Sequence, residues 1–203
     1  MTDTKSLTPY KWLVLGSCVA MLALSYLAMP TYEEIGDEIG YMLRVTARIA
    51  FLFLMLAYIA RPVRMLLGNV SSLRTGVRQY MKHRRFLGLA MAIAHTVHAG
   101  YIASLQLVLG QELGIEILVL GGGALVFMWL MAATSNGPSV DLLGKNWRRL
   151  HLFGLHYLWL VFVYTFAGRI AEDPWYIVAV VAGVLGLLLR SWVYWSVRSK
   201  RAR

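Results

Sequence analysis

Six long stretches of this chain are almost entirely apolar, and short polar segments separate them. They lie at about residues 12–29, 43–63, 86–108, 113–134, 150–168 and 174–196. A helix needs roughly 20 apolar residues to cross a bilayer, and it satisfies its own backbone hydrogen bonds in lipid. The stretches do not alternate with polar residues as the strands of a membrane barrel do. The pattern therefore predicts an all-α membrane protein, with residues 1–203 forming a single transmembrane domain as a six-helix bundle in contact with lipid.

Composition supports this prediction and excludes several other classes. Hydrophobic residues make up 59% of the 203 residues, which is more than the surface of a soluble domain can hide. Six spans use nearly the whole chain, so any flavin or nucleotide domain must belong to a partner. The formal net charge is +10, but the basic residues stand between the apolar stretches, which is typical of topology signals and not of a nucleic-acid interface. Cys18 is the only cysteine and forms no intrachain disulfide.

The connections between the stretches alternate in charge. Those after the second and fourth stretches and the C-terminal tail are basic, carrying Arg61, Arg64, Arg74, Arg78, Lys82, Arg84 and Arg85, then Lys145, Arg148 and Arg149, then Arg198, Lys200, Arg201 and Arg203. The other three are acidic, carrying Glu33, Glu34, Asp37 and Glu38, then Glu112 and Glu116, then Glu172 and Asp173. Lys and Arg remain on the cytoplasmic side. Both termini are therefore expected in the cytoplasm; the family resemblance described below implies a bacterial inner membrane.

The long basic segment at residues 64–85 is predicted to be a loop. It has an amphipathic pattern in Leu66, Leu67, Val70, Leu73 and Val77. Three uses of this segment stay open: a stretch lying in the headgroup layer, a solvated loop whose charges only set topology, or a docking surface for an acidic electron donor.

Histidines are the main candidates for chemistry, because ionisable groups inside a membrane are rare unless they are functional. His95 and His98 lie in the third stretch, whereas His151 and His156 lie in the fifth. Histidine is a usual axial ligand of haem iron, so all four are candidate haem and metal ligands. Depths counted from Arg85 and Arg148 at about 1.5 Å per residue match His95 best with His156.

Two arginines in the second stretch need an anionic partner if they are buried. Arg44 and Arg48 are one helical turn apart, and Arg48 lies at a depth near that of His98. Haem propionates would serve as partners, which makes both arginines candidate cofactor-binding residues. The alternative is that they snorkel or pair with the acidic cluster at residues 33–38. Arg190, near the inner end of the last stretch, is expected to snorkel.

Small residues and thioethers complete the candidate set. Gly121, Gly122 and Gly123 predict close helix packing in the fourth stretch. Methionines are most simply packing residues, although a thioether is a known axial ligand of haem; Met91, Met128 and Met131 are the ones concerned.

Three motifs resemble a known family. The segments RRFLGLAMAIAHTVHAGY (84–101), ARPVRMLLG (60–68) and LGKNWRRLHLFGLHYLW (143–159) are similar to the ferric-reductase-like transmembrane domains. The similarity is greatest to the YedZ/MsrQ-type haem-binding membrane subunit of periplasmic methionine-sulfoxide reductases and covers about residues 40–165. The resemblance implies that His98 and His151 are haem ligands. The family usually has another histidine thirteen positions after the latter, where this chain has Tyr164.

Together these observations predict an electron-transfer subunit of an oxidoreductase, not an enzyme acting alone. It is expected to hold haem b, one haem rather than two. A cytoplasmic flavin reductase carrying FMN, or a quinol, would reduce it, and a periplasmic acceptor protein would oxidise it. The alternative, favoured by Tyr164, is a degenerate bundle that acts as a structural subunit of a larger membrane complex. A third hypothesis, a transporter using the histidines, lacks the interior acids and inverted repeat that it needs.

Overall fold

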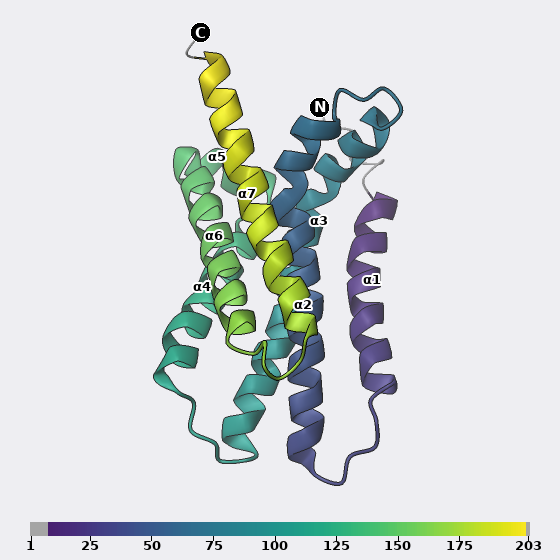
Figure 1. Ribbon diagram of the computed structural model, residues 1–203, viewed down its shortest axis with the longest axis vertical. Coiled ribbons are helices and arrows are strands. Elements are labelled where there is room, and N and C mark those ends of the chain that lie inside the picture. Colours follow the sequence, from purple (N-terminus) through teal and green to yellow (C-terminus); the bar gives the residue numbers. More distant parts are fainter. Residues whose placement is uncertain (1–7, 202–203) are drawn as a thin grey trace.

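The computed structural model describes residues 8–201, which form an all-helical bundle (Figure 1). Arg203 in the basic tail, and the two chain ends whose sidedness is predicted above, lie outside the described residues. The elements in chain order are α1 Thr8–Leu27, α2 Ile35–Leu67, α3 Arg74–Leu107, the π-helical turn η2 Ile117–Gly121, α4 Gly122–Ala133, α5 Gly137–Leu143, α6 Lys145–Ala167 and α7 Trp175–Arg201. Successive long helices run up and down the bundle, as a chain with short polar connections requires.

Five of these helices, α1, α2, α3, α6 and α7, are long and apolar enough to cross a membrane. The predicted fourth span is broken instead of straight. Ile117–Ala133 is followed by α5, which bends away by 106°. The break falls where Asn136 caps α5 by accepting a 2.8 Å hydrogen bond from the Ser139 N–H, with a proline in the first turn. The structure thus has five or six candidate spans, depending on whether this bent pair is counted.

The predicted loop at residues 64–85 is wrong for most of its length. Helix α2 continues to Leu67 and α3 already begins at Arg74, so only Gly68–Leu73 connects them. Basic residues form helices well, and no proline interrupts residues 74–85. The apolar stretch therefore marked only the membrane-facing part of α3 and missed three turns of its basic end.

Charge is sorted between the two ends of the bundle. The start of α1, the α2–α3 connection, α5 and the end of α7 share one end, and the acidic connections lie toward the other (Figure 1). The first is called the basic end and the second the acidic end below. This arrangement agrees with the predicted alternation of the connections, and the side of the membrane that each end faces stays a prediction.

Helix α2 lies at the centre of the bundle and packs against α1, α3, α6 and α7. The core is apolar and includes Phe51, Leu54, Met128, Leu158 and Phe162. Large apolar side chains are also exposed along the outer faces of the helices, for example in α1 and α7. An exterior of this kind is stable against lipid and not against water.

Gly123 and Gly183 each allow a close contact between helices. A Cβ atom at Gly123 would lie 2.7 Å from the Tyr157 hydroxyl, which confirms close packing at this member of the predicted glycine patch. Tyr157 also donates to the carbonyls of Val119 and Leu120 in the π-helical turn, at 3.4 and 3.3 Å. At Gly183 in α7, a Cβ atom would lie 2.6 Å from Cγ2 of Val163 in α6.

We expect Gly183→Leu to destabilise the α6–α7 contact, because the β-branched Val163 side chain is stiff and cannot move aside. Trp159 would also lose its 2.9 Å hydrogen bond to the Gly183 carbonyl if the helices separate. Overpacking of this kind costs about 1–3 kcal/mol, so the thermal unfolding midpoint in detergent should fall. Gly16→Leu is the control, because a Cβ atom at Gly16 meets nothing within 4 Å. Equal midpoints for the two variants would contradict the close contact.

Candidate functional site

The α3 histidines face α2. The rings of His95 and His98 stack with centroids 5.3 Å apart. Nδ1 of His98 lies 3.1 Å from the Leu43 carbonyl and 3.1 Å from Oγ1 of Thr46. The Thr46 hydroxyl donates its own hydrogen to the Met42 carbonyl at 2.6 Å, so Nδ1 of His98 is the donor here. This tautomer leaves Nε2 of His98 with a lone pair.

The α6 histidines lie in different surroundings. Nδ1 of His156 donates to the Leu152 carbonyl at 2.7 Å, which leaves Nε2 with a free lone pair. Its ring lies 5.6 Å from the ring of Tyr58. His151 contacts other side chains instead. Its Nε2 lies 3.1 Å from the Thr134 hydroxyl, and its ring stacks on Trp147 with centroids 4.1 Å apart.

The structure does not bring the two histidine pairs together. His95 packs against Phe162, with ring centroids 5.2 Å apart. His156 precedes Phe162 by six residues and so lies about 9 Å nearer the basic end. The expected match of His95 with His156 is therefore wrong. The prediction assumed that Arg85 and Arg148 lie at the same depth. Because α3 begins at Arg74, Arg85 lies farther from the basic end of the bundle than Arg148 does.

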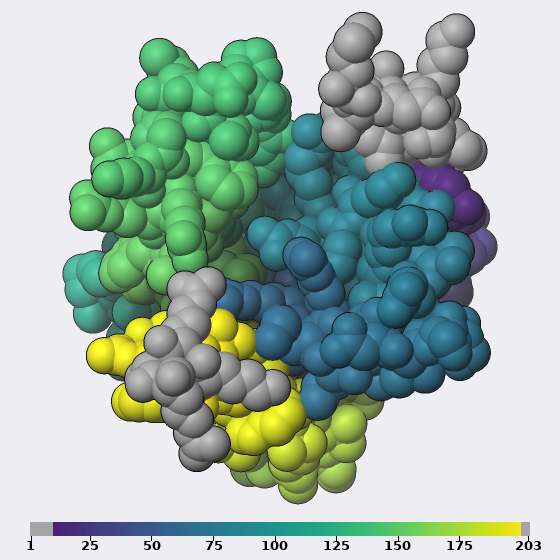
Figure 2. All heavy atoms as spheres, turned by 90° about the horizontal axis from the view of Figure 1, so that it is seen from above, coloured from purple at the N-terminus to yellow at the C-terminus, as the bar shows by residue number. Residues whose placement is uncertain are grey.

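A cavity of about 820 Å³ opens at the basic end, between α2, α3, α4, α5, α6 and α7. Figure 2 looks onto this end, where the surface is hollowed between the green, blue and yellow segments. His151 and His156 line the cavity, whereas His95 and His98 do not. Such a volume lies in the range of small-molecule and cofactor sites.

Five arginines line this cavity with a single acid, Asp141; they are Arg61, Arg84, Arg85, Arg148 and Arg190. Within residues 8–201 the ion pairs are Arg48–Asp173 and Arg169–Glu172, so none of the five has a carboxylate within 4.0 Å there. Arg61 and Arg84 also lie close enough to Arg190 for the like charges to interact. This excess of positive charge in a partly enclosed space favours an anionic ligand.

Arg190 departs from its predicted orientation. Its guanidinium was expected to snorkel, but Nη1 donates to the Tyr58 carbonyl at 2.7 Å and the group lies 4.5 Å from the centroid of the Tyr58 ring. Tyr58 is fully buried, and its hydroxyl has no hydrogen-bond partner among the described residues. A buried hydroxyl without a hydrogen-bond partner costs free energy. The ring of Tyr58 lies beside that of His156, which lines the cavity.

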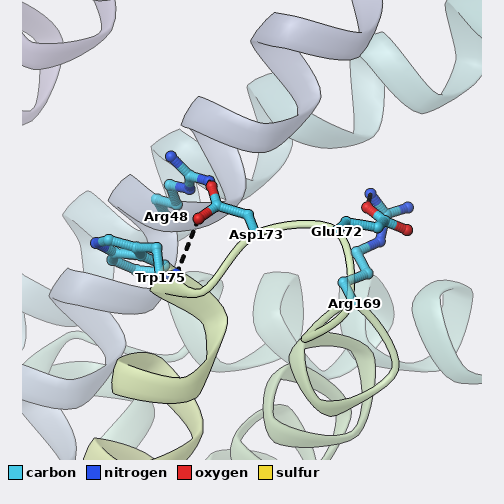
Figure 3. Close-up of polar contacts among 5 residues, drawn as sticks. All are labelled: Arg48, Arg169, Glu172, Asp173 and Trp175. Atoms are coloured by element: carbon cyan, nitrogen blue, oxygen red, sulfur yellow. Dashed lines mark hydrogen bonds and ion pairs between the residues drawn. The ribbon is translucent and has the colours of Figure 1, made fainter.

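Arg48 lies outside the basic cavity and has a protein partner. Its Nη2 donates to Oδ2 of Asp173 at 2.5 Å, and its guanidinium lies over the Trp175 ring at 4.9 Å (Figure 3). Neither a propionate nor the acidic cluster at residues 33–38 is needed to pair this charge. Arg44 is close enough to Asp173 for their charges to interact. The predicted role of Arg44 and Arg48 in cofactor binding stays a prediction, although Arg48 already has a carboxylate partner.

The gathering of these arginines around one cavity was not predicted from the sequence, although a signal existed. Arg61, Arg84 and Arg190 each lie near the end of an apolar stretch, with no acid one turn away on the same helix. Arginines of this kind on three helices that end on the same side can meet around one anion. Sequence alone does not say that the three helices enclose a cavity.

Direct metal coordination by several side chains is not supported. In the part of the chain that the structure describes, no three His, Cys, Asp or Glu residues gather as a metal site. A haem iron needs only two axial ligands, so this finding does not test the haem hypothesis.

A scan against protein-family models and a search of curated proteins found no match to this chain.

Acid should weaken the contact between Asp173 and α2. The Trp175 backbone N–H, which donates to Asp173 at 2.8 Å, and the Arg48 guanidinium lower the pKa of this carboxyl. Because the pKa of this carboxyl is lower in the folded than in the unfolded protein, its ionised form stabilises the fold at pH values above the unfolded pKa. This stabilisation is lost as the pH falls through the folded pKa. We expect the unfolding midpoint of wild type to fall on acidification, and that of D173N to start lower and change less.

The matched control is Glu172→Gln, because Glu172 pairs with Arg169 at 3.7 Å on an exposed turn (Figure 3). Exposed pairs of this type contribute little, so E172Q should follow the wild-type pH profile in detergent. A D173N profile parallel to that of wild type would show that the Arg48 pair does not contribute.

Proposed function

We propose that this chain is a b-type haem-binding membrane electron-transfer subunit. The observation that carries the proposal is the basic cavity, where an imidazole with a free Nε2 and arginines without carboxylate partners line one space of about 820 Å³. A porphyrin is flat and apolar and has two carboxylates, so it needs this combination of groups.

The residues present fit such a ring. His156 has the tautomer of an axial ligand, since its Nδ1–H is held by a carbonyl and its Nε2 is free. Leu54, Ala57 and Leu155 supply apolar wall, and Arg61, Arg84 and Arg190 would hold propionates through charge-assisted hydrogen bonds. When bound, haem supplies one-electron chemistry. The chain would hold the ring, exclude water and tune its potential through ligands and charge.

The direction of electron flow follows from charge and from the family resemblance. With the basic end in the cytoplasm, the cavity faces a cytoplasmic flavin reductase, with FMN in that partner, or a quinol at the membrane surface. An acceptor protein on the periplasmic side of a bacterial inner membrane would take the electron. Enzymatic turnover then belongs to the complex and not to this chain alone.

A structural role in a larger membrane complex is the second candidate. Tyr164, at the position of the family's further histidine, is 54% exposed, and its hydroxyl lies 3.5 Å from Oε2 of Glu116. No contact between Tyr164 and His98 is found among the described residues, so Tyr164 is not proposed as a ligand partner of His98. This favours a bundle that has lost a haem site near His98. Under the structural hypothesis, the basic cavity binds no haem either.

Purified full-length protein should show a Soret band that sharpens and shifts on reduction with dithionite. In a pyridine-haemochrome assay, His156→Ala should retain less than about a tenth of the wild-type haem, because one strong axial bond is removed. His98→Ala is the matched control and should retain most of it. Well-folded wild-type protein without pigment would refute the haem proposal and leave the structural candidate.

The cavity arginines should contribute to haem retention. Arg84→Gln removes a charge opposite a propionate, which at about 1.5–3 kcal/mol weakens haem binding roughly 10–100-fold. Arg78→Gln in the exposed part of α3 keeps the same chemistry outside the cavity and should bind as wild type does. Haem titration of the apoprotein measures both, and equal affinities would refute the propionate assignment.

A further inference from the structure

The basic cavity offers a second ligand that is not histidine. We propose that the thioether of Met91 on α3 is the axial ligand opposite His156, so that the site is a His/Met site. The inference rests on the haem proposal above and specifies its coordination. It depends on three observations: the register of α3 against α6, the donors that line the cavity, and the packing of α4.

The contact between His95 and Phe162 sets the register of the two helices. Helices α3 and α6 run in the same direction, from the basic end toward the acidic end (Figure 1). Met91 lies four residues before His95, and His156 lies six residues before Phe162. Their levels are about 6 Å and about 9 Å nearer the basic end than this contact. The two side chains therefore differ by about 3 Å in depth, which a tilted ring accommodates.

Few cavity residues on α3 can ligate iron. The α3 lining consists of Arg84, Arg85, Gly88 and Met91, of which only the last has a donor that haem iron accepts. Met91 is 3% exposed, so its thioether would have to turn further into the cavity to bind an iron there. On α6, His151 is held by Thr134 and Trp147 and lies about 7 Å nearer the basic end than His156. It is poorly placed to bind the same iron.

The other two cavity methionines lie on the wrong helix. Met128 and Met131 belong to α4, which packs directly against α6. Sδ of Met131 is only 2.8 Å from the position that a Cβ atom would take at Gly154. A ring cannot stand between two helices in such close contact. Nearer the basic end than the His95–Phe162 contact, by contrast, Met91 and His156 line the same cavity, and the proposal places the ring there.

Thioether ligation has a direct functional consequence. A neutral sulfur ligand favours ferrous over ferric haem relative to a second imidazole, and so it raises the reduction potential. The surrounding arginines act in the same direction, because they destabilise the extra positive charge of ferric iron. The site would accept electrons readily and would donate them only to an acceptor of still higher potential.

The test uses the haem-loaded full-length protein and three variants of similar volume. Met91→Leu and the matched control Met128→Leu each remove one cavity thioether at a cost below about 1.5 kcal/mol, so both should fold. Met91→His supplies an imidazole at the same position. The readouts are the near-infrared magnetic circular dichroism of ferric haem, carbon monoxide binding to ferrous haem, and the midpoint potential.

We expect wild type and M128L to show the thioether charge-transfer band and M91L to lose it. Ferrous M91L should bind carbon monoxide more readily, and M91H should give a bis-imidazole spectrum with a lowered potential. A bis-imidazole spectrum in wild type, or a thioether band that survives in M91L, overturns the Met91 assignment and leaves the haem proposal intact. If M91L loses haem, restored binding in M91H supports the assignment and an unchanged deficit overturns it. Wild type without haem refutes both proposals.

Discussion

The architecture depends on one constraint: in hydrocarbon, each backbone N–H and C=O must find its partner inside the protein. Long uninterrupted helices satisfy it, and the chain departs from them where α4 begins and ends. At the first departure, the Tyr157 hydroxyl donates to carbonyls of the π-helical turn. At the second, Asn136 caps the next helix. The 106° bend that follows leads the chain sideways across the basic end, and residues of this bend line the cavity. The candidate site therefore exists because the fourth span stops short.

Arginines at the two ends of the bundle illustrate two ways of handling a charge in a membrane protein. At the acidic end, Arg48 has a carboxylate at 2.5 Å and an aromatic face beside it, so its charge is matched within the fold. At the basic end, Arg190 has only the carbonyl and ring of Tyr58, and its nearby charged neighbours are further arginines. The other four arginines of the cavity are exposed, so water screens part of this repulsion, and an anion in the cavity would reduce it further. A ligand with two carboxylates is one solution, and it is the solution that also uses the imidazole and the apolar wall.

The apolar stretches predicted where the helices lie, because lipid selects continuous apolar sequence. They did not predict where the helices end, because the charged residues 74–85 continue α3 beyond any apolar stretch. This error also affected the predicted pairing of the histidines. Counting depth from Arg85 placed His95 opposite His156, whereas its neighbour on α6 is Phe162. Of the four candidate histidines, His151 and His156 line the basic cavity, and whether any of them binds a cofactor stays a prediction. The cavity and its arginines depend on how six helices meet, which no local pattern encodes.

The position of the cavity bears on how many rings the bundle holds. In the half toward the acidic end, the space between α2 and α6 is filled by Phe51, Phe162 and Phe166, whose rings contact one another at 5.0–5.7 Å. His98 there has a free Nε2, but it lines neither the basic cavity nor the apolar pocket beside Arg48 and Trp175, and Tyr164 is exposed and contacts Glu116. This packing is consistent with the proposal of a single ring in the basic half. If the ring lies there, an electron must still cross the packed aromatic half to reach an acceptor on the other side. A partner subunit that brings its own carrier against α3 or α6 would shorten that path. The electron-transfer and the complex-forming hypotheses then describe two aspects of one assembly.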